Sequence, residues 1–323
     1  MWKTVVRRLL ILIPQLAAVS LFVFFLAYNM PGDALTGAFG EDPNMTPEML
    51  AELRAELGLD DPWFQQYGRW IWNIVSSGDF GRSHTQARAV TDIIGERLGN
   101  TFRLALFTLI LQYSIAIPLG VIAGRKRGTF VDKAIVFYTF FAMAMPTVVL
   151  ALLMLFTFGF NLGWFPIRGS VDVLAPSGSF EYFTSRMHHL ILPAVTGALL
   201  GTVFIINILR AEIIDTQNSD YVTTARSKGV PASRVYSRHI LRNSVLPIVS
   251  ILGFAITGLL TGSVFIEQIF SYPGIGNLFV TSMITRDFPI ANALILMTSF
   301  LTAMGTLLGD ILLTIIDPRI RVR

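Results

Sequence analysis

Six long apolar runs interrupt this sequence and decide what kind of fold it can adopt. They cover residues 9–28, 101–123, 134–160, 190–211, 245–266 and 290–315. A helix of about 20 apolar residues crosses the roughly 30 Å hydrocarbon core of a bilayer, and none of the runs alternates as a membrane β-strand does. With 53% hydrophobic and only 14% charged residues, a soluble domain of this size could not hide so much apolar surface. The sequence therefore predicts an all-α membrane protein with six transmembrane helices.

The first run could be mistaken for a cleaved signal peptide, because the basic residues Lys3, Arg7 and Arg8 precede it. However, the run is long enough to span a bilayer, and no small-x-small cleavage site follows it. We therefore interpret residues 1–30 as an N-terminal tail and an uncleaved first transmembrane helix.

The basic residues indicate the orientation of the predicted helices. Of the 25 Lys and Arg, 16 fall in the N-terminal tail, the loop near residue 128, the stretch 210–243 and the C-terminus. Residues 31–100 contain only five Arg against eleven acidic residues. Because loops rich in Lys and Arg stay inside the cell, we expect both termini in the cytoplasm and residues 31–100 outside it.

The outer segment 31–100 carries helix signals. "TPEMLAELRAELGLD" opens with Thr46 as an N-cap candidate and closes on Gly58. The following stretch "DPWFQQYGRWIWNIV" repeats apolar residues at helical spacing, namely Trp63, Tyr67, Trp70 and Ile74. We expect a small helical extracytoplasmic subdomain. Its aromatic residues are interpreted as packed inward or resting on the membrane interface; a sugar-binding aromatic platform is the less favoured alternative, since the spacing already explains them.

Small residues and prolines recur within the apolar runs. Glycine pairs four residues apart, which let helices approach closely in lipid, occur at 120/124, 197/201, 258/262 and 305/309. Prolines at 14, 118, 146 and 193 are expected to kink helices or to mark re-entrant ends. The pattern predicts a tightly packed helical bundle.

Residues for catalysis or ion coupling are scarce. The ionisable residues Arg103, Glu267 and Asp310 fall near the ends of the predicted spans, not at mid-membrane where ion relays operate. The chain has no cysteine, no GxxxxGK[ST] phosphate loop and no GxSxG motif. The adjacent residues His188 and His189 would point about 100° apart on a helix. We therefore expect no metal site, no enzymatic activity and no ATP hydrolysis by this chain alone.

A basic polar island, "SDYVTTARSKGVPASRVYSRHILRN" at 219–243, separates two of the apolar runs. Ser219 or Asp220 can cap a short helix, Tyr221–Lys228. Gly229 then suits the position after the helix, and Pro231 can start a second helix.

Two interpretations of this island are possible. Val222 and Ala225 would share one helix face, which suits docking of a small-residue surface into a groove of another protein. A solvated loop that only obeys the orientation rule explains the charge but not the capped two-helix layout.

The island also resembles a known sequence element. "TTARSKG" followed by "RHILRNSVLP" is similar to the cytoplasmic EAA loop of ABC-importer permeases, in the form carried by the dipeptide and oligopeptide family. Ala225 and Gly229 match that loop, whereas Thr223 and Thr224 stand where Glu and Ala are usual, so contacts made by that Glu are not carried over. The later proline is displaced to Pro247.

Other stretches extend the resemblance over the whole chain. They are "LGLDDPWFQQYGRWIWNIVSSGDFGRS", "HLILPA", "EQIFSYPGIGNL" and "DPRIR". By this likeness the chain is identified as a member of the B-type permeases of dipeptide and oligopeptide ABC importers.

The resemblance implies a type I ABC importer permease fold. Residues 101–323 would form a five-helix permease core that includes a cytoplasmic coupling loop, 212–243. It also implies a complex with a homologous second permease, two cytoplasmic ATPase subunits and an extracytoplasmic solute-binding protein, in the cytoplasmic membrane of a bacterium or archaeon. ATP and Mg would be bound by the ATPases; no cofactor in this chain and no nucleic-acid partner are expected. Peptide is the expected solute, with nickel chelates, glutathione and oligosaccharides as alternatives.

The resemblance assigns roles to three groups of residues. The expected ATPase-coupling residues are Tyr221, Ala225, Arg226, Lys228, Gly229 and Arg234. An extracytoplasmic element, either a gate or a connecting loop that cannot continue a helix, is expected at Glu267, Tyr272, Pro273, Gly274 and Gly276. The translocation path is placed at Met143, Met145 and Pro146, although ordinary packing also explains methionines there.

Gly229→Pro or Ala225→Glu is expected to leave the chain inserted but to uncouple ATP hydrolysis from uptake. Two rival functions remain. A secondary transporter or channel conflicts with the ion-poor midplane, and an intramembrane enzyme or assembly factor conflicts with the lack of a paired catalytic constellation.

Overall fold

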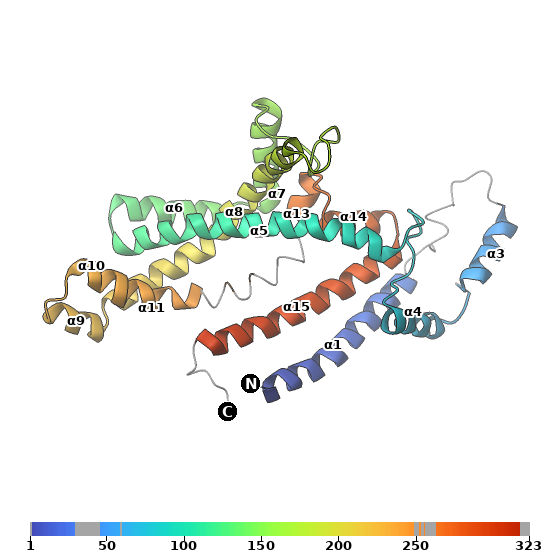
Figure 1. Ribbon diagram of the computed structural model, residues 1–323, viewed down its shortest axis with the longest axis horizontal. Helices are drawn as coiled ribbons and strands as arrows, with labels where there is room; N and C mark the ends of the chain where they lie inside the picture. The colour runs from blue at the N-terminus through green and yellow to red at the C-terminus, as the bar shows by residue number, and fades with distance from the viewer. Residues whose placement is uncertain are drawn as a thin grey trace. The chain divides into compact units, whose positions relative to one another are not determined.

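The computed structural model describes residues 2–29, 46–58, 60–248, 252, 255 and 263–316 (Figure 1). The predicted glycine pair at 258/262 and the "DPRIR" stretch at 317–321 lie outside these residues, as do the side chains of residues 2–9 and 308–316. The described elements are helices, with one isolated antiparallel bridge between Arg82 and Ala89. A mostly helical protein is therefore confirmed.

Four of the described helices are long and apolar enough to cross a membrane. They contain the segments Leu10–Asn29, Val90–Arg125, Phe180–Gln217 and Phe288–Leu307. The bent pair Phe130–Ala144 and Thr147–Asn161 makes a fifth if it is counted as one span. These segments match five of the six predicted runs. The remaining run, 245–266, lies largely outside the described residues, so the count of six stays a prediction.

The run 134–160, predicted as one span, is broken. Helix α6 (Phe130–Ala144) ends before Met145, and α7 (Thr147–Met154) continues into the π-helical turn η1 (Leu155–Asn161). The two parts are bent by 103°. Pro146 stands at the start of α7 with an extended backbone, where its missing N–H costs no helical hydrogen bond. The prolines at 14, 118 and 193 instead lie inside continuous helices.

The described chain forms two compact units. The first contains α1 (Trp2–Asn29), α3 (Pro47–Leu57), α4 (Trp63–Ser77), the start of α5 (Val90–Arg125), α14 (Ile275–Ile284) and α15 (Phe288–Ile316) through Leu307. The second contains the rest of α5, α6, α7, η1, α8 (Phe180–Gln217), α9 (Asp220–Ser227), α10 (Ala232–Arg234), η2 (Val235–Leu241), α11 (Arg242–Ser244) and most of α13 (Val264–Ile269).

In the first unit, the aromatic residues of α4 pack on α1. The Tyr67 hydroxyl lies 2.9 Å from Ser20 Oγ, and the ring centroids of Phe24 and Tyr67 are 5.5 Å apart. Trp70 also packs on Phe24, at 5.7 Å. The spacing of aromatic residues along α4 therefore reflects packing between helices, as the favoured interpretation predicted.

The ends of α3 follow the sequence signals. Thr46 Oγ1 accepts a hydrogen bond from the Met49 N–H at 3.3 Å, and Gly58 ends the helix with φ of 63°. A left-handed backbone of this kind favours glycine.

A buried carboxylate ties the segment before α5 to the start of α15. Asp287 is 1% exposed and follows Arg286, whose φ is 58°. Its Oδ2 accepts hydrogen bonds from Ser83 Oγ at 2.5 Å and Thr85 Oγ1 at 2.6 Å, and from the Thr85 N–H at 3.3 Å. Oδ1 accepts one from the His84 N–H at 3.3 Å. This tie fixes the segment 83–85 on the end of a predicted membrane helix.

Asp287→Ala is expected to lower the free energy of unfolding by about 2–3 kcal/mol, because it leaves the buried Ser83 hydroxyl and the partly buried donors of His84 and Thr85 without their charged acceptor. Unfolding titrations in mixed detergent micelles measure the loss. The matched control is Asp79→Ala, since the Asp79 carboxylate is exposed and accepts from the nearby Gly81 N–H, at 2.8 Å. Equal stability of the two variants would contradict a structural role for the Asp287 tie.

In the second unit, α5 and α8 approach closely at glycines. A Cβ added at Gly120 would lie 3.0 Å from the Leu209 Cβ, and one at Gly124 would lie 2.8 Å from the Ile213 Cβ. A Cβ added at Gly201 would lie 2.6 Å from Gln112. The glycine pairs at 120/124 and 197/201 therefore permit the close helix approach that their spacing predicted.

Candidate functional site

The basic island folds as a short helix followed by a tight turn. Helix α9 (Asp220–Ser227) begins after Ser219, whose carbonyl accepts hydrogen bonds from the N–H groups of Val222 and Thr223, both at 3.1 Å. The Ser219 hydroxyl does not cap the helix, because it donates to the Thr216 carbonyl at 2.7 Å. Ser219 therefore holds the N-cap position through its backbone.

The turn after α9 is closed by backbone hydrogen bonds. The Gly229 N–H donates to the Arg226 carbonyl at 2.9 Å, and the Val230 N–H donates to the Ala225 carbonyl at 3.2 Å. Gly229 has φ of 73°, a conformation that L side chains rarely adopt. The prediction that Gly229 ends the helix is confirmed, and the reason is backbone geometry.

A second helical stretch begins one residue after the predicted start. Pro231 is the N-cap of α10 (Ala232–Arg234), which continues into the π-helical turn η2 (Val235–Leu241) and α11 (Arg242–Ser244). The Ser244 hydroxyl reaches α8, where it lies 3.2 Å from the Glu212 carbonyl and 3.2 Å from Thr216 Oγ1. The island thus returns to the helix from which it departs. The π-helical turn has no counterpart in the sequence signals.

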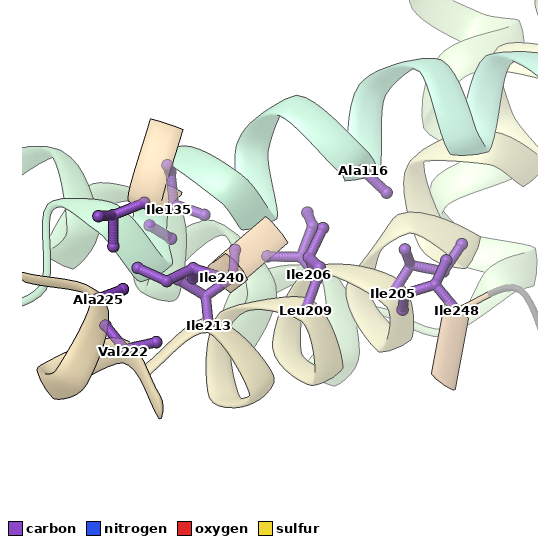
Figure 2. Packing of buried hydrophobic residues seen from close by; sticks show 12 residues of the cluster. Ala116, Ile135, Ile205, Ile206, Leu209, Ile213, Val222, Ala225, Ile240 and Ile248 are labelled. Atoms are coloured by element: carbon purple, nitrogen blue, oxygen red, sulfur yellow. The ribbon is translucent and has the colours of Figure 1, made fainter. Parts of the chain in front are cut away.

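The inner face of α9 is part of the core of the second unit. Val222 is fully buried and Ala225 is 7% exposed. Figure 2 shows both side chains on the side of α9 that faces Ile213 and Ile240, and all four belong to one cluster of buried residues. The sequence suggested that this small-residue face meets another protein. The structure instead gives it partners within the chain, so the small size of Ala225 permits close packing of α9 on its own core.

The outer face of the island carries the remaining predicted coupling residues. Tyr221 is 45% exposed, and its hydroxyl accepts a hydrogen bond from Asn243 Nδ2 at 3.2 Å. The other exposed residues of this set are Arg226, Lys228, Gly229 and Arg234. We call these five residues the outer surface of the island. They lie together on the α9 turn and the start of α10, which leaves a cationic face available for a partner.

Polar contacts fasten the island and the end of α8 to the last turn of α5. The Arg125 guanidinium lies 5.1 Å from the ring centroid of Tyr236, a favourable cation–π arrangement. Gln217 Nε2, at the end of α8 before the island, donates to the Gly124 carbonyl at 3.5 Å. The island is therefore attached to α5 as well as to α8.

A buried ion pair near this turn was not foreseen from the sequence. Arg210 Nε donates to Asp132 Oδ1 at 2.7 Å, and Arg210 Nη2 donates to Asp132 Oδ2 at 2.9 Å. The Gly128 N–H donates to Asp132 Oδ2 at 2.8 Å. In the sequence, Asp132 is an acidic residue in the first turn of an apolar helix. Such a position is common and does not indicate which residue the carboxylate contacts.

The predicted extracytoplasmic element is a break between two helices. Helix α13 (Val264–Ile269) ends before Tyr272, whose N–H donates to the Glu267 carbonyl at 2.8 Å. Glu267 is fully buried and Tyr272 is 1% exposed; burial raises the pKa of the Tyr272 phenol to about 12, so this hydroxyl stays neutral.

Helix α14 then starts at Ile275. The predicted interruption at Pro273 and Gly274 is confirmed, whereas Gly276, expected in the loop, is helical. Asn100 Nδ2 donates to the Pro273 carbonyl at 2.9 Å, and the Ile275 N–H donates to Thr101 Oγ1 at 2.7 Å. These bonds fix the start of α14 on α5.

The residues predicted for the translocation path gather at the break between α6 and α7. Met143 is 73% exposed, Met145 is intermediate and Pro146 is exposed. They lie together because they are neighbours in the sequence.

The two adjacent histidines, His188 and His189, lie within hydrogen-bonding distance of backbone carbonyls. His188 Nε2 lies 2.6 Å from the Trp164 carbonyl, and His189 Nδ1 lies 2.8 Å from the Ser185 carbonyl. Within the described part of the chain, no three His, Asp or Glu residues gather as metal ligands would.

The chain matches two families of sequences. Residues 116–322 match the family described as binding-protein-dependent transport system inner membrane component, and residues 1–105 match the family of its N-terminal region.

Similar proteins match over the full length. The oligopeptide transport system permease protein AppB of Bacillus subtilis (strain 168) is 38% identical, with 98% of each chain covered. The di/tripeptide transport system permease protein DppB of Pseudomonas aeruginosa (strain UCBPP-PA14) is 32% identical, with 99% of each covered.

A solved structure shares the fold. A chain from the inward-facing MetNI methionine ABC transporter superposes with a TM-score of 0.54 at 13% identity, covering 70% of this chain and 97% of that one. This likeness supports the fold alone.

Proposed function

The chain belongs to the binding-protein-dependent transport system inner membrane component family, and from this premise we propose that it is the permease subunit of an ATP-driven importer that moves peptides into the cytoplasm. The single observation that carries the solute class is the full-length match to relatives named as oligopeptide and di/tripeptide permeases. Nickel chelates, glutathione and oligosaccharides remain the alternative solutes within the same type of complex.

We propose six transmembrane helices with both termini in the cytoplasm and residues 31–100 outside. The long apolar helices and the positions of the basic residues support this topology. The partners would be a homologous second permease, two cytoplasmic ATPases that bind ATP and Mg, and an extracytoplasmic solute-binding protein. A second permease is needed because one chain offers a single island, whereas two ATPases require two docking sites.

The island would couple ATP hydrolysis to movement of the membrane helices. Its outer surface is exposed and cationic, so it can meet an ATPase. Its inner face, at Val222 and Ala225, belongs to one buried cluster with Ile213 of α8. Ile240 of η2 belongs to the same buried cluster, so a displacement of α9 would be passed through this cluster to α8, a helix long enough to cross the membrane.

The break between α13 and α14 would lie at the extracytoplasmic entrance, either as a gate or as a connector. Met143, Met145 and Pro146 would belong to the path at the bend between α6 and α7. The bend supports this placement, because a broken helix within a membrane is either buried in protein or lines a water-filled cavity, and Met143 and Pro146 are exposed in this chain.

Affinity purification of the chain from its native membrane in mild detergent tests the proposed complex. A second permease and ATPases are expected to co-purify, with ATP hydrolysis and peptide uptake after reconstitution with the binding protein. A stable chain that purifies alone, without ATP hydrolysis, would favour a secondary transporter. Uptake of a nickel chelate, glutathione or an oligosaccharide in place of peptide would change the proposed solute but would leave the proposed complex unchanged.

Reversing the charge of the outer surface is expected to uncouple transport. The double variant Arg226→Glu/Lys228→Glu should lower peptide uptake by about tenfold or more and weaken ATPase co-purification, because like charges placed opposite a complementary surface repel. Both side chains are exposed, so the stability of the permease should not change.

The matched control is Lys126→Glu, an exposed basic residue on the separate turn between α5 and α6. Full uptake by the double variant, or an equal loss in the control, would rule out the outer surface as the docking site.

A further inference from the structure

A hollow between α6 and α8 lies beside the turn that joins α5 to α6, and its volume is about 460 Å³. Its charged lining comes from Arg127, Asp132, Lys133 and Arg210. Its apolar lining comes from Val136, Phe137 and Phe140. The hollow is not part of the island, and the proposed coupling mechanism does not use it.

The polar end of the hollow has an excess of positive charge. Asp132 is the one acidic residue in the lining, but its side chain is 4% exposed and is held by Arg210 and by the Gly128 N–H. Its charge is therefore matched within the protein. Arg127 and Lys133 are exposed and remain as the cations that an anionic group would meet.

The apolar end continues from the cations along one face of α6. Lys133, Val136, Phe137 and Phe140 follow helical i, i+3, i+4 and i+7 spacing, which places them in one row. Phe137 is 72% exposed and Phe140 is 68% exposed. With a rise of 1.5 Å per residue, the row extends about 10 Å away from Lys133. The hollow therefore joins a cationic end to an apolar wall.

We propose that this hollow binds an anionic phospholipid of the inner leaflet. The headgroup phosphate would lie between Arg127 and Lys133, and an acyl chain would lie along Val136, Phe137 and Phe140. Helix α6 belongs to a segment apolar enough to cross a membrane, and basic pockets between transmembrane helices at the cytoplasmic side hold anionic lipid headgroups.

The combination of a cationic end and an apolar wall favours a phospholipid over other occupants of the hollow. A free phosphate ion would use the two cations but would leave the exposed phenyl rings of Phe137 and Phe140 without a partner. A phospholipid satisfies both ends, because its headgroup is anionic and its chains are apolar. The site rests on the proposed orientation of α6, not on the identity of the transported solute.

Lipid binding can be measured on the purified, delipidated complex by native mass spectrometry and by thermal stabilisation. Phosphatidylglycerol is expected to bind and stabilise the complex, whereas phosphatidylcholine and inorganic phosphate are not. The double variant Arg127→Ala/Lys133→Ala should weaken phosphatidylglycerol binding by about tenfold, since each basic residue near an anionic lipid surface adds to the attraction. Neither side chain holds Asp132 through a hydrogen bond, so the variant should fold normally.

Two further variants separate the alternatives. Lys126→Ala removes an exposed cation of the same turn that does not line the hollow, and it should bind the lipid normally. Phe137→Ser/Phe140→Ser should weaken binding of long-chain phosphatidylglycerol. Three results would overturn the proposal. An equal loss of lipid binding in Lys126→Ala would mean nonspecific attraction, and stabilisation of the complex by inorganic phosphate would mean a phosphate site. Protection of Lys133 from chemical labelling only when the second permease is present would mean a protein interface. Failure of peptide uptake in other experiments would leave it intact.

Discussion

Asp132→Ala is expected to lower the free energy of unfolding by about 3 kcal/mol, because it leaves the Arg210 guanidinium in a partly buried position without its anion. Asp132 is 4% exposed and Arg210 is 28% exposed at the side chain. The value belongs at the lower end of the range for broken buried pairs, since water still reaches part of Arg210. The Gly128 N–H, which donates to the same carboxylate, would also lose its acceptor.

A double-mutant cycle in mixed detergent micelles measures the coupling between the two residues. Asp132→Ala and Arg210→Ala should each be strongly destabilising, while the double variant should be less destabilised than the sum of the two. Asp61→Ala is the matched control, because its partner Arg69 lies 2.7 Å away in a pair whose side chains are 40% and 54% exposed. The control should lose less than about 1 kcal/mol. Additive losses at Asp132 and Arg210 would show that the pair contributes no coupling.

The sequence could not have predicted this pair. Asp132 and Arg210 are separated by 78 positions, and their contact depends on the side-by-side packing of α6 and α8. In the sequence, Arg210 is one of the basic residues that indicate the orientation of the helices. That indication comes from the whole segment and does not identify a partner for one side chain. The contact between Asp287 and Ser83 could not be predicted for the same reason, since 204 positions separate the two residues.

Features governed by local backbone chemistry were predicted well. Gly58 and Gly229 end their helices at left-handed positions, as expected from helix-ending signals. The apolar runs predicted the long helices correctly, because the thickness of a membrane sets the length of an apolar helix that crosses it. The bend at Pro146 was only half predicted. A proline signals a break or a kink, but the 103° angle depends on what packs around it.

The short helix and the turn of the island were predicted, while the sequence did not show which face of α9 is buried. Periodicity placed Val222 and Ala225 on one face, but it cannot say whether that face meets another protein or the core of the same chain. The three-dimensional contacts with Ile213 and Ile240 answer that question. As a result, the residues proposed to transmit motion inside the chain can be separated from those proposed to meet a partner.

Ala225→Glu is expected to reduce the stability and the membrane abundance of the permease, and not only to uncouple it as the sequence suggested. Ala225 is 7% exposed among apolar side chains, and burying an unpaired carboxylate costs several kcal/mol. Thr224→Glu is the matched control, because Thr224 is the preceding residue on the same helix and is exposed. It adds the same charge without burial, so the stability of that variant should stay close to wild type.

Gly229→Pro completes the comparison. Proline cannot adopt the φ of 73° found there, and it removes the N–H that donates to the Arg226 carbonyl. Because Gly229 is exposed and no atom lies within 4 Å of an added Cβ, the damage should stay within the turn, so the chain should still insert while uptake falls. Thermal unfolding and uptake measured on the three variants therefore test the inner face separately from the outer surface. If Ala225→Glu were as stable as Thr224→Glu, the buried cluster that joins α9 to α8 could not be the route of the proposed coupling.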